Sequence, residues 1–132
     1  MLKAKDIMTT TVLAVTRDMD IYGAIRLMVE NNVTGLPVID HDRTLVGIVT
    51  EKDVLRLLYE NEDRPGRVED FMTDAVVAFE ADVELDAVAT GLAANPFRRV
   101  PIVREGTLVG IISRKDVIKR IREQWLSTPH SV

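Results

Sequence analysis

Two motifs in this sequence place a hydroxyl three residues before a carboxylate, Thr50-Glu51-Lys52-Asp53 and Ser113-Arg114-Lys115-Asp116. Each motif follows an apolar, strand-like run and begins a helical pattern. At such a junction this spacing is close to a capping box, and we expect Thr50 to accept a hydrogen bond from the backbone N–H of Asp53. This cap would stabilise the helix by about 1 kcal/mol. A structural role therefore explains either motif by itself.

Few other residues offer catalytic chemistry. The two histidines are His41, in a predicted hairpin turn, and His130, near the end of the chain, and neither lies beside a plausible nucleophile. The sequence has no Gly-x-Ser-x-Gly, no phosphate-binding glycine loop and no His-Glu-x-x-His. It has no cysteine, which excludes disulfides, thiolate metal sites and a cysteine nucleophile. We therefore expect a protein without enzymatic activity.

The composition is that of an ordinary globular protein. The 132 residues are 46% hydrophobic and 29% charged, enough for one compact domain or two packed halves of about 60 residues. A net charge of −4 gives no general attraction to nucleic acid or anionic membranes. No apolar run approaches the roughly 20 residues that span a bilayer, and the N-terminus lacks a secretory signal. The cytoplasm is the expected compartment.

The motif occurs twice because the whole chain repeats itself. A shift of 64 residues aligns Asp6-Ile7-Met8-Thr9 with Asp70-Phe71-Met72-Thr73. After one residue is lost near Arg43, Thr44-Leu45-Val46-Gly47-Ile48 matches Thr107-Leu108-Val109-Gly110-Ile111. Matches extend from one end of the unit to the other, which chance does not produce. The sequence therefore encodes two copies of one structural unit.

Each copy predicts the element order β-α-β-β-α, an α+β fold. Strands are expected at 12–15, 36–39 and 45–49, and again at 76–79, 100–103 and 108–112. Helical spacing begins at Ile21 and at Leu85, with Asp18 or Asp20 capping the first helix and Asp82 the second. Closing helices are expected at 51–59 and 114–125. The predicted organisation is repeat 1 at residues 1–60, a linker at 61–69, repeat 2 at 70–126 and a flexible tail at 127–132.

Three features together are typical of one family: the two Asp-x-Met-Thr openings, the segment Gly35-Leu36-Pro37-Val38-Ile39-Asp40 and the junction Thr50-Glu51-Lys52-Asp53. On these residues the chain resembles the cystathionine-β-synthase (CBS) domain family over nearly its whole length. The resemblance implies two repeats packed sheet to sheet as a pseudo-twofold pair, a Bateman module, which usually forms a dimer. Such modules generally perform no chemistry. AMP, ADP, ATP or S-adenosylmethionine binds in two clefts between the repeats and shifts conformation or partner binding.

The resemblance also implies which residues contact the ligand. In this family the aspartate of the Ser/Thr-x-x-Asp motif accepts hydrogen bonds from the ribose hydroxyls, and the helix N-terminus suits a phosphate. Ile48 and Ile111 would flank the adenine, although strand core explains them equally well. The first cleft would combine Thr50, Asp53 and Ile48 with Thr73, Ala78, Phe97, Arg98 and Arg99. The second would combine Ser113, Asp116 and Ile111 with Thr9, Ala14, Val33 and Thr34.

The two clefts should differ in charge. Arg98 and Arg99 precede the second strand proline, where the first repeat has Thr34 and Gly35. In the regulatory subunit of AMP-activated protein kinase, basic residues at this place bind phosphates, and an arginine pair suits that role. The alternative is an exposed pair in weak surface ion pairs. We expect the Thr50/Asp53 cleft to take a phosphorylated nucleotide, with Mg²⁺ as an optional companion of the phosphates.

A second interpretation is a ligand-free module that dimerises or docks onto another domain. Apolar positions on the closing helices are expected in the core, while Tyr59 and Trp125 are candidates for a dimer face. The expected partners are an adenosyl ligand, a second copy of the chain and an unidentified regulated protein. Nucleic acid is not an expected partner, because one arginine pair on an acidic chain is a poor electrostatic footprint, and no membrane partner is expected.

Overall fold

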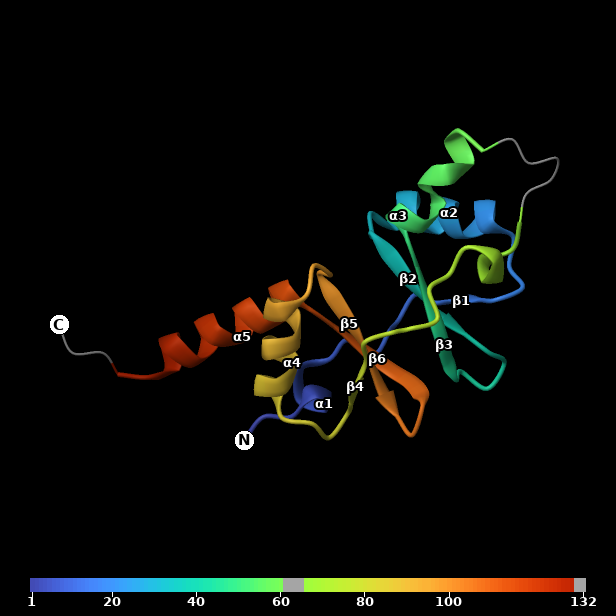
Figure 1. Cartoon of the computed structure of the whole chain (residues 1–132). Coiled ribbons are helices and arrows are strands. Elements are labelled where there is room, and N and C mark those ends of the chain that lie inside the picture. The colour runs from blue at the N-terminus through green and yellow to red at the C-terminus, as the bar shows by residue number, and fades with distance from the viewer. Residues whose placement is uncertain (61–65, 130–132) are drawn as a thin grey trace. The chain divides into compact units, whose positions relative to one another are not determined.

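The computed structural model describes residues 1–60 and 66–129, which form two compact units (Figure 1). The first unit contains Leu13–Val76 and Gly106–Leu108, and the second contains Met1–Val12, Val77–Glu105 and Val109–Val132. Each unit has a three-stranded sheet, in the orders β1-β2-β3 and β4-β5-β6. The predicted α+β fold with a duplicated β-α-β-β-α order is therefore confirmed. No helix in the described ranges is long and apolar enough to cross a membrane.

In the first unit, β1 (Val15–Thr16) runs parallel to β2 (Gly35–Ile39), which pairs antiparallel with β3 (Leu45–Thr50). Between β1 and β2, α2 (Ile21–Asn31) buries Ile21, Ala24 and Met28, whose spacing gives one apolar face. Asp20 caps it, because its carboxylate accepts from the N–H of Tyr22 at 2.9 Å. The chain then continues from β3 into α3 (Glu51–Val54) and the 3₁₀ helix η1 (Leu55–Leu58).

The second unit repeats this plan. Its β4 (Phe79–Glu80) runs parallel to β5 (Arg99–Arg104), which is also bonded to β6 (Thr107–Ser113). The crossover helix α4 (Leu85–Ala94) buries Leu85, Val88 and Leu92, again on one face. The closing helix α5 (Arg114–Ser127) is much longer than its counterpart α3. The prediction that the apolar positions of the closing helices lie in the core is wrong for Leu55, Leu58, Ile118 and Ile121, which are mostly exposed.

Each unit is completed by a segment from the other sequence repeat. In the second unit, α1 (Ala4–Ile7) buries Ala4, whose N–H donates to the carbonyl of Val83 at 2.8 Å. In the first unit, the 3₁₀ helix η2 (Val68–Asp70) buries Val68, and Phe71 follows it into the same core. The compact units therefore exchange the opening segments of the two repeats.

Several elements begin or end at other residues than the sequence predicts. The opening strands begin later, at Val15 and Phe79, and the closing segment predicted at 51–59 changes from α to 3₁₀ after Val54. The predicted cap Asp82 is wrong, because Glu84 is the N-cap of α4 and Asp82 pairs with Lys5 and Arg104 instead.

The predicted linker and tail are only partly described. Residues 61–65 and 130–132 lie outside the described residues. Of the predicted linker, Val68 is fully buried, and of the predicted tail, Ser127 still belongs to α5.

Candidate functional site

The first candidate group lies where β3 gives way to α3. Thr50 is the N-cap of α3, and its backbone N–H donates to Asp53 Oδ2 at 2.8 Å. The Thr50 hydroxyl also donates to Asp53 Oδ2, at 3.0 Å. Both residues are half-buried. The bond from the Thr50 N–H to the carboxylate, one half of the predicted capping box, therefore orients Asp53 and occupies one of its oxygens. The other half is wrong in its direction, because the Thr50 hydroxyl donates to the carboxylate and does not accept from the Asp53 N–H.

Thr73 joins this group from the beginning of the second sequence repeat. Its backbone forms a two-bond bridge with Ile48 on β3, with N···O distances of 3.0 and 2.8 Å. The Thr73 hydroxyl then lies 3.4 Å from Asp53 Oδ1. The approach needs a glycine in β3, because a Cβ placed on Gly47 would lie 2.9 Å from the Thr73 carbonyl oxygen. Predicted site residues from both repeats thus meet within one compact unit.

The second unit has the matching group at the start of α5. Ser113 N–H donates to Asp116 Oδ2 at 2.8 Å, and the N–H of Asp116 donates to Ser113 Oγ at 3.1 Å. Thr9 forms a two-bond bridge with Ile111, as Thr73 does with Ile48. The two predicted motifs therefore have the same backbone setting, and each presents a half-buried carboxylate beside a hydroxyl.

This arrangement suits a ligand with neighbouring hydroxyl groups. An ionised carboxylate has about four acceptor positions, and the capping bonds use only Oδ2. The contact from Thr73 to Oδ1, at 3.4 Å, is longer than a strong hydrogen bond. Asp53 Oδ1 therefore keeps acceptor capacity toward solvent, while Oδ2 holds the group in place.

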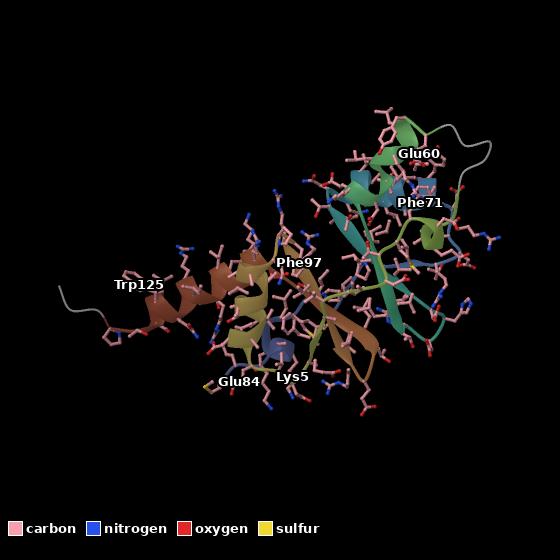
Figure 2. All side chains as sticks on the ribbon, in the orientation of Figure 1. Lys5, Glu60, Phe71, Glu84, Phe97 and Trp125 are labelled. Carbon is pink, nitrogen blue, oxygen red and sulfur yellow. The ribbon has the colours of Figure 1, made fainter. Side chains whose placement is uncertain are left out.

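Arg98 and Arg99 lie in the second unit, at the beginning of β5 and beside the start of α5. The Arg98 carbonyl accepts from the N–H of Arg114 at 2.8 Å, and Figure 2 marks Phe97 at this place. The Arg114 guanidinium is committed to the end of α4, with bonds to the Leu92 and Asn95 carbonyls at 3.1 and 2.7 Å. Among the described residues, Arg98 is exposed and Arg99 half-buried, and neither side chain belongs to an observed ion pair.

The predicted site residues divide between the two units. The first unit brings together Thr50, Asp53, Ile48 and Thr73, and it also holds Ala14, Val33 and Thr34. The second holds Ser113, Asp116, Ile111, Thr9, Ala78, Phe97, Arg98 and Arg99. The pairing of Asp53 with the arginines, and of Asp116 with Ala14, Val33 and Thr34, stays a prediction.

A separate polar pocket of about 220 Å³ lies at the far end of β1 and β2 in the first unit, lined by Arg17, Asp18, Asp40 and His41 among others. Arg17 pairs with Asp40 through two bonds of 2.8 and 3.0 Å, which raises the pKa of Arg17. A hydrogen bond from the Thr16 hydroxyl lowers the pKa of Asp18. Arg17 and Asp40 neutralise one another in this pocket. Within the described ranges no group of three His, Asp or Glu side chains is arranged for a metal ion.

Known proteins share both the sequence pattern and the fold. The CBS domain family matches residues 4–60 and 68–123. An uncharacterised protein of Methanocaldococcus jannaschii, MJ1225, is 35% identical over 121 residues, which cover 92% of this chain and 43% of that protein. The chain thus spans less than half the length of this relative.

Two solved structures carry ligands. CBSX2 of Arabidopsis thaliana in complex with AMP has a TM-score of 0.85 and 31% identity, over 95% of this chain and 99% of that one. The CBS domain pair of MJ0100 in complex with 5′-methylthioadenosine and S-adenosyl-L-methionine has a TM-score of 0.78 and 26% identity, over 93% of this chain and 98% of that one.

Proposed function

Because this chain belongs to the CBS-domain family, with two domains that together cover most of its length, we propose that it is a non-catalytic regulatory module that binds an adenosine-containing ligand. The observation that carries the proposal is the capped carboxylate of Asp53. Its Oδ2 is held by Thr50, and its Oδ1 keeps acceptor capacity for the two vicinal hydroxyls of a ribose. Asp116 offers the same arrangement in the second unit.

The proposed ligand class follows from two further features. AMP in CBSX2, and methylthioadenosine and S-adenosylmethionine in MJ0100, share an adenosine group. Arg98 and Arg99 supply two guanidinium groups outside the observed ion pairs, and guanidinium binds phosphate with charge-assisted, bidentate hydrogen bonds. We therefore propose a phosphorylated adenosine nucleotide as the ligand whose ribose Asp53 binds, with Mg²⁺ as an optional companion of its phosphates.

Thermal unfolding with and without ligand tests this proposal. AMP, ADP, ATP, S-adenosylmethionine and 5′-methylthioadenosine are added separately at millimolar concentration, with GMP as the control for the base. A ligand at 100 times its dissociation constant stabilises the folded state by about 2.7 kcal/mol. In a domain of this size the unfolding midpoint then rises by about 10 °C. If none of the adenosine compounds raises the midpoint above the GMP control, the sensor proposal fails and a docking module remains.

A further inference from the structure

The second unit carries an apolar groove between its two longer helices, α4 and α5, which pack side by side (Figure 1). A hollow of about 390 Å³ opens between them. Ala89 and Ala93, one helical turn apart on α4, give it one wall of small side chains. Ile118 and Ile121 on α5 also line it, yet they remain 62% and 59% exposed. Apolar area of this kind, left in solvent in a hollow, indicates a contact surface.

A second hollow of about 340 Å³ adjoins the first, because both are lined by Ala89, Val117 and Ile121. It extends to Leu85, the first residue of α4. From Leu85 to Ala93 the wall on α4 is about 12 Å long at a rise of about 1.5 Å per residue, which is about two helical turns. The two hollows together form the α4–α5 groove, whose shape suits one face of a helix laid along it.

A row of basic side chains runs along α5 beside this groove. Lys115, Lys119 and Arg122 are three and four residues apart, so they are neighbours on the helix surface, and Ile118 adjoins two of them. All three basic side chains are exposed. Among the described residues, none of the three belongs to an observed ion pair. The edge of the groove therefore carries positive charge that no described carboxylate pairs with.

The two acidic residues of α5 already have partners. Asp116 accepts a hydrogen bond from the Ser113 N–H at 2.8 Å, and Glu123 pairs with Arg120 at 3.3 Å. Among the described residues that line the groove, Asp86 is the one acidic side chain. With five basic and two acidic side chains, α5 has a net charge of +3 in a chain whose total is −4. Positive charge is thus gathered on this helix.

Charge and shape together select one class of occupant. A second copy offering the same groove would bring together two α5 helices of net charge +3, which repel one another. A lipid surface is flat on this scale, so its anionic head groups would meet the lysines without filling the groove. An acidic amphipathic helix meets both requirements, because its apolar side chains enter the groove while its carboxylates face Lys115, Lys119 and Arg122.

We propose that the α4–α5 groove binds an acidic amphipathic helix of another protein, the one whose activity this module regulates. The inference rests on the proposed function in naming that protein as the regulated one, but the contact itself needs no nucleotide. Apolar residues at i, i+4 and i+7 of the partner helix lie between the alanines of α4 and the isoleucines of α5. Glutamates or aspartates beside them pair with the basic row.

The probe is a synthetic helical peptide of about four turns, with leucines at i, i+4, i+7 and i+11 and with glutamate and alanine elsewhere. Its control keeps the leucines and has lysine in place of every glutamate. The chain contains a single tryptophan, Trp125 on α5 (Figure 2), whose emission reports on a helix that covers this face. The acidic peptide should shift the emission to shorter wavelength and bind at least about tenfold more tightly than the basic one. Equal binding of the two peptides, or binding of neither, would overturn the proposal.

Substitutions then locate the contact. Ile118→Asp should weaken binding of the acidic peptide by about tenfold or more with little change in the unfolding midpoint, since Ile118 is exposed. Val29→Asp is the matched control, because Val29 is a 74% exposed apolar residue on α2 of the other unit, and it should keep full affinity. Lys119→Glu should weaken the acidic peptide and strengthen the basic one, whereas Lys52→Glu, at an exposed position of α3, should change neither. If Ile118→Asp and Lys119→Glu bind like the wild type, the peptide lies elsewhere and the inference is wrong.

Sedimentation and lipid vesicles test the other occupants. A wild-type dimer that Ile118→Asp converts to a monomer would assign the groove to a second copy and overturn the proposal. A shift of the Trp125 emission with phosphatidylglycerol vesicles, but not with the acidic peptide, would assign it to lipid and overturn the proposal too. All peptide titrations are done without nucleotide. Peptide binding by a chain that no adenosine compound stabilises would therefore refute the sensor function and keep the docking surface, and the reverse result would refute only the docking surface.

Discussion

The hydroxyl of Thr73 lies 3.4 Å from Oδ1 of Asp53, although Thr73 belongs to the opening segment of the second repeat and Asp53 to the closing helix of the first. The backbone bridge between Thr73 and Ile48 creates this proximity, and the small size of Gly47 permits the bridge. The carboxylate is thus held by Thr50 on one oxygen and approached by Thr73 on the other. A ligand hydroxyl that displaces the long Thr73 contact would gain a charge-assisted bond without moving the carboxylate.

Asp53→Ala should weaken binding of the adenosine ligand by about tenfold to a hundredfold, because hydrogen bonds to a charged group contribute roughly 1.5–3 kcal/mol. The measurement is isothermal titration with the nucleotide that raises the unfolding midpoint most. Asp70→Ala is the matched control, since Asp70 Oδ2 accepts a capping bond from Arg67 N–H at 2.8 Å in the same unit. The control should lose comparable stability and keep its affinity. Equal affinity in both variants would refute the ribose role of Asp53.

Arg99→Ala should reduce the affinity for AMP and ATP by about tenfold or more and leave that for adenosine unchanged, because only the phosphates are bound by the guanidinium. The affinity of Arg99→Lys for AMP and ATP should lie between those of the wild type and Arg99→Ala, since lysine keeps the charge but not the bidentate geometry. The control is Arg26→Ala, which removes an exposed arginine paired with Glu30 at 2.8 Å. Competition titrations with adenosine and AMP measure the difference. A parallel loss for adenosine and AMP would place Arg99 in a structural role.

The sequence predicted those features that repeat or that have a clear period. Apolar spacing located the buried faces of α2 and α4, and the Thr50 to Asp53 spacing predicted the capping box. The exchange of opening segments was not predicted, because one or two buried residues, Ala4 in one segment and Val68 and Phe71 in the other, carry too little pattern to show which sheet they pack against. The change to 3₁₀ after Val54 was not predicted either, because Leu and Arg, which make up residues 55–58, are good α-helix formers.

The two equivalent strand glycines should respond differently to alanine. A Cβ on Gly47 would lie 2.9 Å from the Thr73 carbonyl oxygen, which is backbone, whereas the three atoms nearest to a Cβ on Gly110 belong to the side chain of Met8. Gly47→Ala should therefore lower the free energy of unfolding by about 1–3 kcal/mol, and Gly110→Ala by less. Urea unfolding of both variants measures the two losses. Equal losses would show that Met8 cannot move away, contrary to this reasoning.

The ion pair between Lys5 and Asp82, at 2.9 Å, should make the anchoring of the N-terminal segment depend on pH. The hydrogen bond and charge of Lys5, with a further contribution from Arg104, hold the pKa of Asp82 below its ordinary value of 3.8. Because the folded pKa is the lower one, the unfolded chain binds more protons, and the stability from this pair is present above about pH 4 and lost as the pH falls. The effect should be small, since both side chains are largely exposed.

Lys5→Met should accordingly lower the unfolding midpoint at pH 7 and lower it less at pH 2, where the contribution of the pair is diminished. Lys52→Met is the matched control, because it removes the same charge from an exposed position in the first turn of α3. Thermal unfolding followed by circular dichroism at the two pH values separates the pair from the general effect of net charge. A midpoint that drops equally at both pH values would mean that Lys5 stabilises the segment through packing of its aliphatic chain and not through Asp82.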